Sequence, residues 1–136
     1  MKWVVDTCVL IDVLDNDSSF GKRSALALTA HMGDGLVVCP VTYIELAPAF
    51  DGSLSLQEEF FAGIGVDRQM GWIHEDTLAA HSAWARYVQA RREKRDRRRP
   101  IADVMIGAFA LRFSGLITRN VADFRSLWPG LKIIAP

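Results

Sequence analysis

Short apolar runs punctuate the chain at intervals and are separated by stretches with helical periodicity. The runs are rich in β-branched residues, which favour strands, and most are bounded by polar residues, proline or glycine. We expect strands at 3–5, 36–39, 116–118 and 132–134, and a weaker strand at 72–73. No strand exceeds a few residues, so any sheet must be small.

The stretches between these runs repeat their apolar residues at helical spacing. Asp76 is the expected N-cap of a long helix, Pro100 the first residue of the next one, and Gly115 its C-cap. The helix after Pro100 is apolar nearly all round and should therefore be buried. The predicted helices cover 9–14, the segment after Pro40 up to 46, 24–32, 54–64, 76 to about 91, 101–113 and 120–127.

Strands that alternate with helices predict a parallel sheet with helices on both faces, a three-layer α/β fold. The 136 residues, half of them hydrophobic, suit one domain over 1–136. The sequence contains no apolar stretch of membrane-spanning length, and Asp6 interrupts the first apolar run too early for a signal peptide. Cys8 and Cys39 are too few for a disulfide framework and are expected to be small core residues. We therefore expect a cytoplasmic protein without a membrane partner.

Acidic residues recur where the predicted strands end. Because ligands of open parallel sheets bind at the carboxyl ends of the strands, these carboxylates should converge at one edge. Four unpaired carboxylates repel one another, and their hard oxygens suit Mg²⁺ or Mn²⁺. The residues concerned are Asp6, Glu45, Asp103 and Asp123, together with the polar Thr118 and Asn120.

Each of these acids also has a purely structural interpretation. Asp6 could cap the helix that follows it, and Glu45 could be a solvated charge on a helix face. Asp103 could complement a helix dipole, although an unpaired carboxylate on a buried helix is costly. Asp123 has the spacing of a capping pair with Asn120. The joint arrangement, rather than any single residue, favours a metal site.

Four segments in order resemble PIN-domain ribonucleases, and most closely the VapC type of toxin from prokaryotic toxin–antitoxin pairs. They are residues 5–7 (VDT), 41–46 (VTYIEL), 100–108 (PIADVMIGA) and 117–124 (ITRNVADF). The resemblance covers the whole chain. It implies a PIN-like fold and a Mg²⁺- or Mn²⁺-dependent endoribonuclease that hydrolyses RNA phosphodiester bonds.

The resemblance also implies roles for individual residues. Asp6, Glu45 and Asp103 match the family's acidic ligands, with Asp6 and Asp103 as primary ligands and Glu45 acting through water. Many members place the fourth acid where this chain has Asn120. Either Asp123 or a water held by Asn120 then completes the set, which leaves the number of metal ions open. Thr7 and Thr118 match small hydroxyl positions that line the family's site.

The chain carries equal numbers of basic and acidic residues, but residues 91–99 hold seven basic and two acidic side chains. This run precedes Asp103, and we expect Arg95, Arg97, Arg98 and Arg99 to hold RNA phosphates at the rim of the site. A solvated helix end and the docking of an acidic partner remain open. The resemblance further implies an RNA substrate such as tRNA or rRNA, a cognate antitoxin and a homodimer, for which residues 50–64 are the candidate face.

Other functions fit the residues less well. A haloacid-dehalogenase-like phosphatase needs a second aspartate where Cys8 stands, and a receiver domain needs a lysine where Arg119 stands. An integrin-type metal site needs a DxSxS motif that the segment after Asp6 lacks, and His74 and His81 have the wrong spacing for HExxH. The main alternative is a catalytically inactive PIN-like module that binds RNA or protein.

Overall fold

A single parallel sheet organises the computed structural model, which describes residues 1–92 and 100–136. The strand order is β3-β2-β1-β4-β5, and every neighbouring pair is parallel. The first and fourth strands of the chain are therefore neighbours at the centre of the sheet. The strands are β1 (Trp3–Val5), β2 (Leu36–Val37), β3 (Val66–Asp67), β4 (Gly115–Ile117) and β5 (Ile133–Ile134).

Helices connect the strands and cover the sheet. The α-helices are α1 (Thr7–Leu14), α2 (Gly21–His31), α3 (Pro40–Glu45), α4 (Leu54–Ile64), α5 (His74–Arg92), α6 (Ile101–Ala110) and α7 (Val121–Leu127). Two short 3₁₀ helices, η1 (Met32–Asp34) and η2 (Ala47–Phe50), extend α2 and α3.

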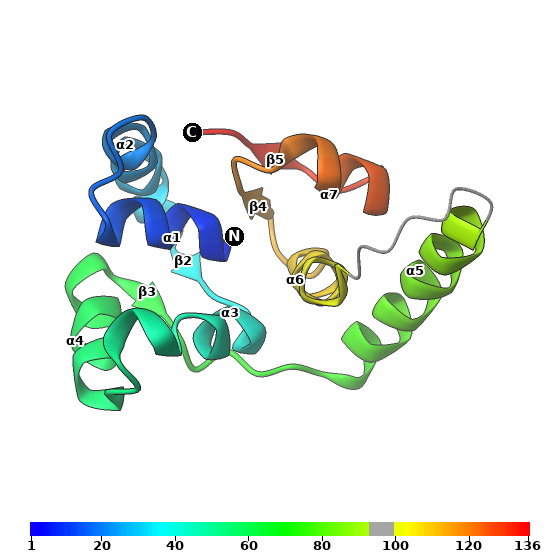
Figure 1. Ribbon diagram of the computed structural model, residues 1–136, viewed down its shortest axis with the longest axis horizontal. Coiled ribbons are helices and arrows are strands. Elements are labelled where there is room, and N and C mark those ends of the chain that lie inside the picture. The colour runs from blue at the N-terminus through cyan, green and yellow to red at the C-terminus, as the bar shows by residue number, and fades with distance from the viewer. Residues whose placement is uncertain (93–99) are drawn as a thin grey trace.

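The two faces of the sheet carry separate hydrophobic cores. Successive strand residues point to opposite faces, so Val4 and Leu116 pack with α5, α6 and α7, while Val5 and Ile117 pack with α1, α2 and α4. Figure 1 shows these two groups of helices on either side of the sheet. The predicted three-layer α/β architecture is confirmed.

The prediction of a weak strand at 72–73 is wrong, and the third strand in chain order is β3 instead. Val66 is the only apolar residue of β3, so two residues give no alternation that a sequence pattern could detect. Residues 72 and 73 lead into α5: the Trp72 indole donates to Thr77 Oγ1 over 2.8 Å, and the Ile73 N–H donates to Asp76 Oδ2 over 3.0 Å. Residues 72 and 73 therefore lead into the first turn of α5 and form no strand.

Asp76 is the third residue of α5 and not its N-cap, so that prediction is wrong by one turn. Its carboxylate is 1% exposed and forms a bidentate ion pair with Arg112, whose Nε and Nη2 each lie 2.8 Å from an oxygen. Arg112 also donates to the Gly71 carbonyl. This pair joins the start of α5 to the end of α6, which carries Asp103.

Helix α6 ends at Ala110 with Leu111 as its C-cap, earlier than predicted. Gly115 is the first residue of β4 instead of the C-cap, because it lies against the Lys132 carbonyl, where a Cβ would overlap it. Pro100 is the N-cap residue of α6 and not its first residue as predicted, because the helix begins at Ile101. The helix is buried along most of its length, as expected.

A glycine lets α7 approach α6 closely. A Cβ at Gly107 would overlap the Trp128 indole, which lies directly after α7 and is buried in the core. Gly107 stands one turn after Asp103, and Trp128 follows the helix that carries Asp123. This contact therefore fixes the two helices that bring these acids to one edge.

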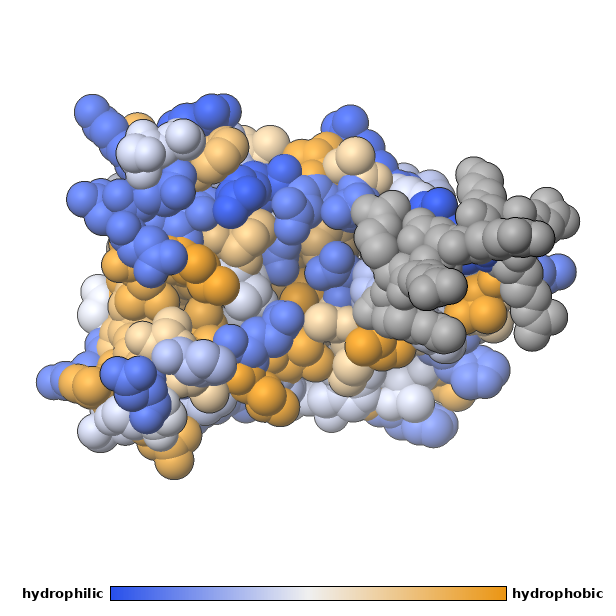
Figure 2. All heavy atoms as spheres, in the orientation of Figure 1, coloured by the Kyte–Doolittle hydropathy of each residue, from blue (hydrophilic) through white to orange (hydrophobic). Residues whose placement is uncertain are grey.

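The face seen in Figure 2 carries both hydrophilic and hydrophobic residues, with the hydrophobic ones gathered in patches. In the candidate dimer region, Phe61 is buried and Phe50 and Phe60 pack against the core, whereas Leu54 and Leu56 of α4 are exposed. Within residues 1–92 and 100–136, none of the helices combines the length and the apolar character that crossing a bilayer requires.

Candidate active site at the carboxyl edge of the sheet

Asp6 directly follows β1 and forms the N-cap of α1. Its carboxylate is 2% exposed and accepts from the Thr7 backbone N–H over 2.8 Å, from Thr118 Oγ1 over 2.7 Å and from Cys8 Sγ over 3.2 Å. The expected capping role is therefore real, and it coexists with a position at the carboxyl end of the central strand.

Burial raises the pKa of Asp6, while the hydrogen bonds from Thr118, Cys8 and the Thr7 N–H and the charge of Arg119 act against that rise. Thr118 itself follows β4 and accepts from the Asn120 backbone N–H over 3.0 Å while donating to Asp6. The hydroxyl is thus oriented from both sides, and it holds the Asp6 carboxylate in one position.

Glu45 is the last residue of α3 and its side chain is exposed. The Thr7 hydroxyl donates to Glu45 Oε1 over 2.7 Å and lies 3.0 Å from the hydroxyl of the buried Thr42. Thr7 therefore links α1 to α3 through Glu45 and Thr42.

Asp103 lies in the first turn of α6 and is partly buried. Burial, and then the negative charges of Asp6, Asp123 and Glu45 in that order, together raise its pKa to about 6. Four acids from separate segments are therefore close enough to influence one another electrostatically. This convergence is what the positions of the acids along the chain predicted.

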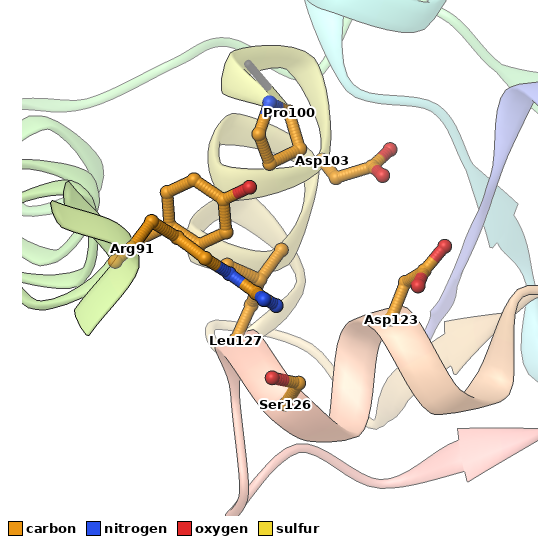
Figure 3. Close-up of a pocket in the computed structure, with 7 residues that line it drawn as sticks. Arg91, Pro100, Asp103, Asp123, Ser126 and Leu127 are labelled. Carbon is orange, nitrogen blue, oxygen red and sulfur yellow. The ribbon is translucent and has the colours of Figure 1, made fainter. Parts of the chain in front are cut away.

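Asn120 and Asp123 take different places. Asn120 is the N-cap residue of α7, but its side chain forms no capping hydrogen bond. Asp123 is an exposed residue of the first turn, and with Asp103 it lines a cavity of about 270 Å³. Figure 3 shows the Asp103 and Asp123 carboxylates extending to the same side, from α6 and α7. The charge of Asp123 contributes to the raised pKa of Asp103.

The chemistry of the donor set fits a hard divalent cation, because carboxylate and hydroxyl oxygens are the ligands that Mg²⁺ and Mn²⁺ prefer. In the part of the chain that the structure describes, no three acidic, histidine or cysteine side chains stand in a ready ligand arrangement. Glu45 and Asp123 are exposed, so their side chains have room to turn inward. The acidic side chains therefore lie near one another, but they do not form a complete coordination shell.

Comparison with known proteins supplies the family. Residues 3–126 match the PIN domain. The chain belongs to the PIN-domain family. A chain in the crystal structure of VapBC2 from Rickettsia felis, bound to a DNA fragment from their promoter, shares the fold with a TM-score of 0.63. It is 13% identical, and the match covers 99% of this chain and 98% of that chain. No curated protein sequence matches.

Cys8 was expected to be a core residue; in this PIN domain it is partly buried against the core and also contacts the site through Asp6. Its thiol lies 3.2 Å from Asp6 and 3.7 Å from Thr118, and burial together with the charge of Asp6 raises its pKa to about 12. Cys39 is a buried core residue as predicted. The position of Cys8 in the first turn after Asp6 could have indicated this contact, because side chains gather around an N-cap.

Sequence reasoning also missed a buried ion pair beneath the PIN-domain site. Asp12 is 2% exposed and accepts two hydrogen bonds from Arg119, over 2.8 and 2.9 Å, and one from Ser24. The Arg119 guanidinium also lies over the Phe20 ring. Arg119 follows Thr118, so this pair fixes the backbone that carries the hydroxyl bound to Asp6.

The binding of RNA phosphates by the basic run remains a prediction. Arg95, Arg97, Arg98 and Arg99 lie outside the described residues of this PIN domain. Arg91, the first residue of the run, is described and lines the same cavity as Asp103 and Asp123.

Proposed function

We propose that this PIN-domain protein is a divalent-metal-dependent endoribonuclease that hydrolyses RNA phosphodiester bonds. The observation that carries the proposal is the convergence of Asp6, Glu45, Asp103 and Asp123 at one edge of the sheet. Burial and the charges of the other three acids raise the pKa of Asp103 there. Carboxylates that repel one another in this way are stabilised by a cation, and PIN domains are generally nucleases. Hydrolysis needs no histidine if a metal ion is present.

In the proposed mechanism Asp6 and Asp103 hold Mg²⁺ or Mn²⁺, with Glu45 and Asp123 completing the site. When bound, the ion lowers the pKa of a coordinated water and stabilises charge on the phosphoryl oxygens. Thr118 and the Thr7 N–H fix the Asp6 carboxylate, and the Thr7 hydroxyl orients Glu45. Glu45 then orients the attacking water, because its carboxylate is exposed and held on one oxygen.

We further propose that the protein is the toxin of a toxin–antitoxin pair, acts as a cytoplasmic homodimer and takes an RNA such as tRNA or rRNA. The shared fold with a chain of the VapBC2 complex supports this role. Arg95, Arg97, Arg98 and Arg99 would hold RNA phosphates near Asp103, because the basic run immediately precedes that residue in the sequence.

The second candidate is a PIN-like binding module without activity. It is favoured by one observation, that the described carboxylates do not stand in a ready ligand arrangement. The two candidates differ in whether the protein binds a metal ion at Asp6 and cleaves RNA.

The test is cleavage of end-labelled total cellular RNA by the purified protein in Mg²⁺, in Mn²⁺ and in EDTA. Asp6→Asn is compared with Asp15→Asn, which changes an exposed acid at the other end of α1. We expect discrete fragments that require metal, vanish with Asp6→Asn and persist with Asp15→Asn. Metal binding by wild type but not by Asp6→Asn, without any cutting, indicates a nuclease with a narrow target, whereas no cutting and no metal binding supports the binding module. Cleavage that Asp6→Asn leaves unchanged contradicts the proposed site.

A further inference from the structure

The cavity next to the carboxylates has walls of three chemical kinds. Asp103 and Asp123 form the side shared with the acidic cluster, and Arg91 lies opposite on α5 (Figure 3). Leu127 contributes an apolar surface and Ser126 a hydroxyl. With a volume of about 270 Å³, the cavity is smaller than common drug-sized pockets of about 300 Å³ or more, so it suits one small group.

The cationic wall is supported by aromatic rings. The Arg91 guanidinium carbon lies 5.3 Å from the centre of the Tyr87 ring, one turn earlier on α5. Tyr87 is stacked in turn on Trp84, with ring centres 5.7 Å apart and planes 19° apart. Such stacking orients the guanidinium plane. Its five N–H groups allow it to keep its present contacts and still bind an anion.

We propose that this cavity is the subsite for one nucleotide that flanks the scissile phosphate, with Arg91 binding its phosphate and Tyr87 and Ser126 contacting its base. The inference rests on the proposed ribonuclease function and deepens it. Asp103 and Asp123 border both the cavity and the acidic cluster, so a group in the cavity is adjacent to the reacting phosphate.

The mixture of walls selects a nucleotide over other ligands. A nucleotide joins an anion, a flat ring and hydrogen-bonding edges in one unit, and these match the guanidinium, the apolar and aromatic surface, and the hydroxyls of Ser126 and Tyr87. An acidic peptide would use the guanidinium, but it offers no flat ring to match the apolar and aromatic surface. The hydroxyls are the groups that can distinguish one base from another.

The first experiment measures base preference. A randomised single-stranded RNA library is cut in Mg²⁺ by the full-length protein, and the cut ends are sequenced for wild type, Ser126→Ala and Tyr87→Phe. Both changes remove a hydroxyl and keep the bulk of the side chain. We expect the ratio of preferred to disfavoured base to change about three- to tenfold at a single position beside the cut. Arg125→Gln, an exposed neighbour that does not line the cavity, should leave the profile unchanged.

The second experiment measures phosphate binding separately from cleavage. Binding of a short fluorescent RNA is followed by anisotropy in Ca²⁺ at several salt concentrations. Arg91→Gln should weaken binding about tenfold and lower the salt slope by about 0.7, the value for one phosphate contact on a single strand. Arg91→Lys should keep the slope, and Arg125→Gln should behave as wild type. Melting temperatures of all variants establish that they are folded.

The outcomes separate the inference from the function beneath it. If wild type cuts RNA and neither the base profile nor the salt slope changes in the variants, the subsite is wrong and the ribonuclease stands. If nothing is cut but Arg91→Gln still weakens RNA binding as expected, the cavity binds a nucleotide and the enzyme proposal fails. If RNA is neither cut nor bound, or if only an acidic peptide binds, the inference is overturned.

Discussion

The carboxylate cluster has two halves that are built differently. Asp6 and Glu45 follow β1 and β2, and hydroxyls hold both: Thr118 donates to Asp6, and Thr7 donates to Glu45. Asp103 belongs to α6 and Asp123 to α7, and within the described residues no hydrogen-bond donor contributes to the pKa of Asp103. One half is an ordered scaffold. The other, beside the cavity, is called the bare half because, among the described residues, no donor offsets the burial and like charges at Asp103.

The difference shows what each half contributes. Hydrogen bonds from fixed donors offset part of the cost of burying a carboxylate because the donors replace water, although burial still leaves the pKa of Asp6 raised. A carboxylate with burial and like charges around it lowers the stability of the folded protein, and this cost is recovered only when a cation binds. We therefore expect the ordered half to determine where a metal ion sits and the bare half to determine how strongly it is retained.

The largest expected effect comes from neutralising one acid in each half. Asp6→Asn and Asp103→Asn should both reduce RNA cleavage by at least about a thousandfold, because each removes a primary ligand of the proposed metal. The two variants should differ in stability. Asp103→Asn removes only repulsion, whereas Asp6→Asn also loses acceptor capacity toward Thr118, Cys8 or the Thr7 N–H.

Chemical denaturation of both variants in EDTA at pH 8 measures this difference. Asp103→Asn should have a free energy of unfolding at or above that of wild type, and at least about 1 kcal/mol above that of Asp6→Asn. Asp15→Asn is the matched control for removal of an acidic charge. Equal stability of the two site variants would contradict the division into an ordered and a bare half.

The hydroxyl beneath Asp6 should have the next largest effect. Thr118→Val keeps the shape of the side chain but loses the bond to Asp6 and the acceptor for the Asn120 N–H. Removing a partner that orients a metal ligand should lower metal affinity about 10- to 100-fold. Titration with Mn²⁺ measures this, and Thr118→Ser should stay within about threefold of wild type because it retains the hydroxyl. A Thr118→Ser variant as weak as Thr118→Val would assign the effect to packing.

The ordered half was more accessible to sequence reasoning than its supports. Asp6 and Thr118 stand directly after apolar strands, so the rule that ligands gather at carboxyl ends of strands locates both. Asp103 was visible as an acid on an otherwise apolar helix. The ion pairs Asp12–Arg119 and Asp76–Arg112 were missed because each joins residues far apart in the chain. No local pattern records such a contact.

The fold shows the same limit. Strands with two or more adjacent apolar residues were predicted, and β3 was not, because its pairing with β2 rather than its composition makes it a strand. Gly115 was misassigned as a helix cap because a glycine after a helix usually is one. Here its role is the close approach of the Lys132 carbonyl, a tertiary contact.

The charge on the bare half should make stability depend on pH. Because the pKa of Asp103 is raised to about 6 in the folded protein, the folded state binds a proton more tightly than the unfolded state does. In EDTA the free energy of unfolding should therefore fall as pH rises from about 4 through 6, by about 1 kcal/mol after allowing for solvent screening of a partly exposed group. Asp103→Asn should reduce this slope, and saturating Mg²⁺ should reverse it. A wild-type slope that Asp103→Asn leaves unchanged would remove Asp103 as its source.

The smallest expected effect tests whether every donor of the ordered half matters equally. A thiol is a weak donor, and the Cys8 bond to Asp6 is longer than the Thr118 bond, at 3.2 against 2.7 Å. Cys8→Ser keeps a donor and should change stability by less than about 0.5 kcal/mol and cleavage by less than about threefold. Cys8→Ala should cost about 0.5–1 kcal/mol. Thermal unfolding and cleavage rates measure both.

Because the pKa of the Cys8 thiol is about 12, it should also react slowly with iodoacetamide at pH 8. A tenfold loss of cleavage in Cys8→Ser would mean that the sulfur does more than donate to Asp6, and the ordered half would then depend on Cys8 as much as on Thr118.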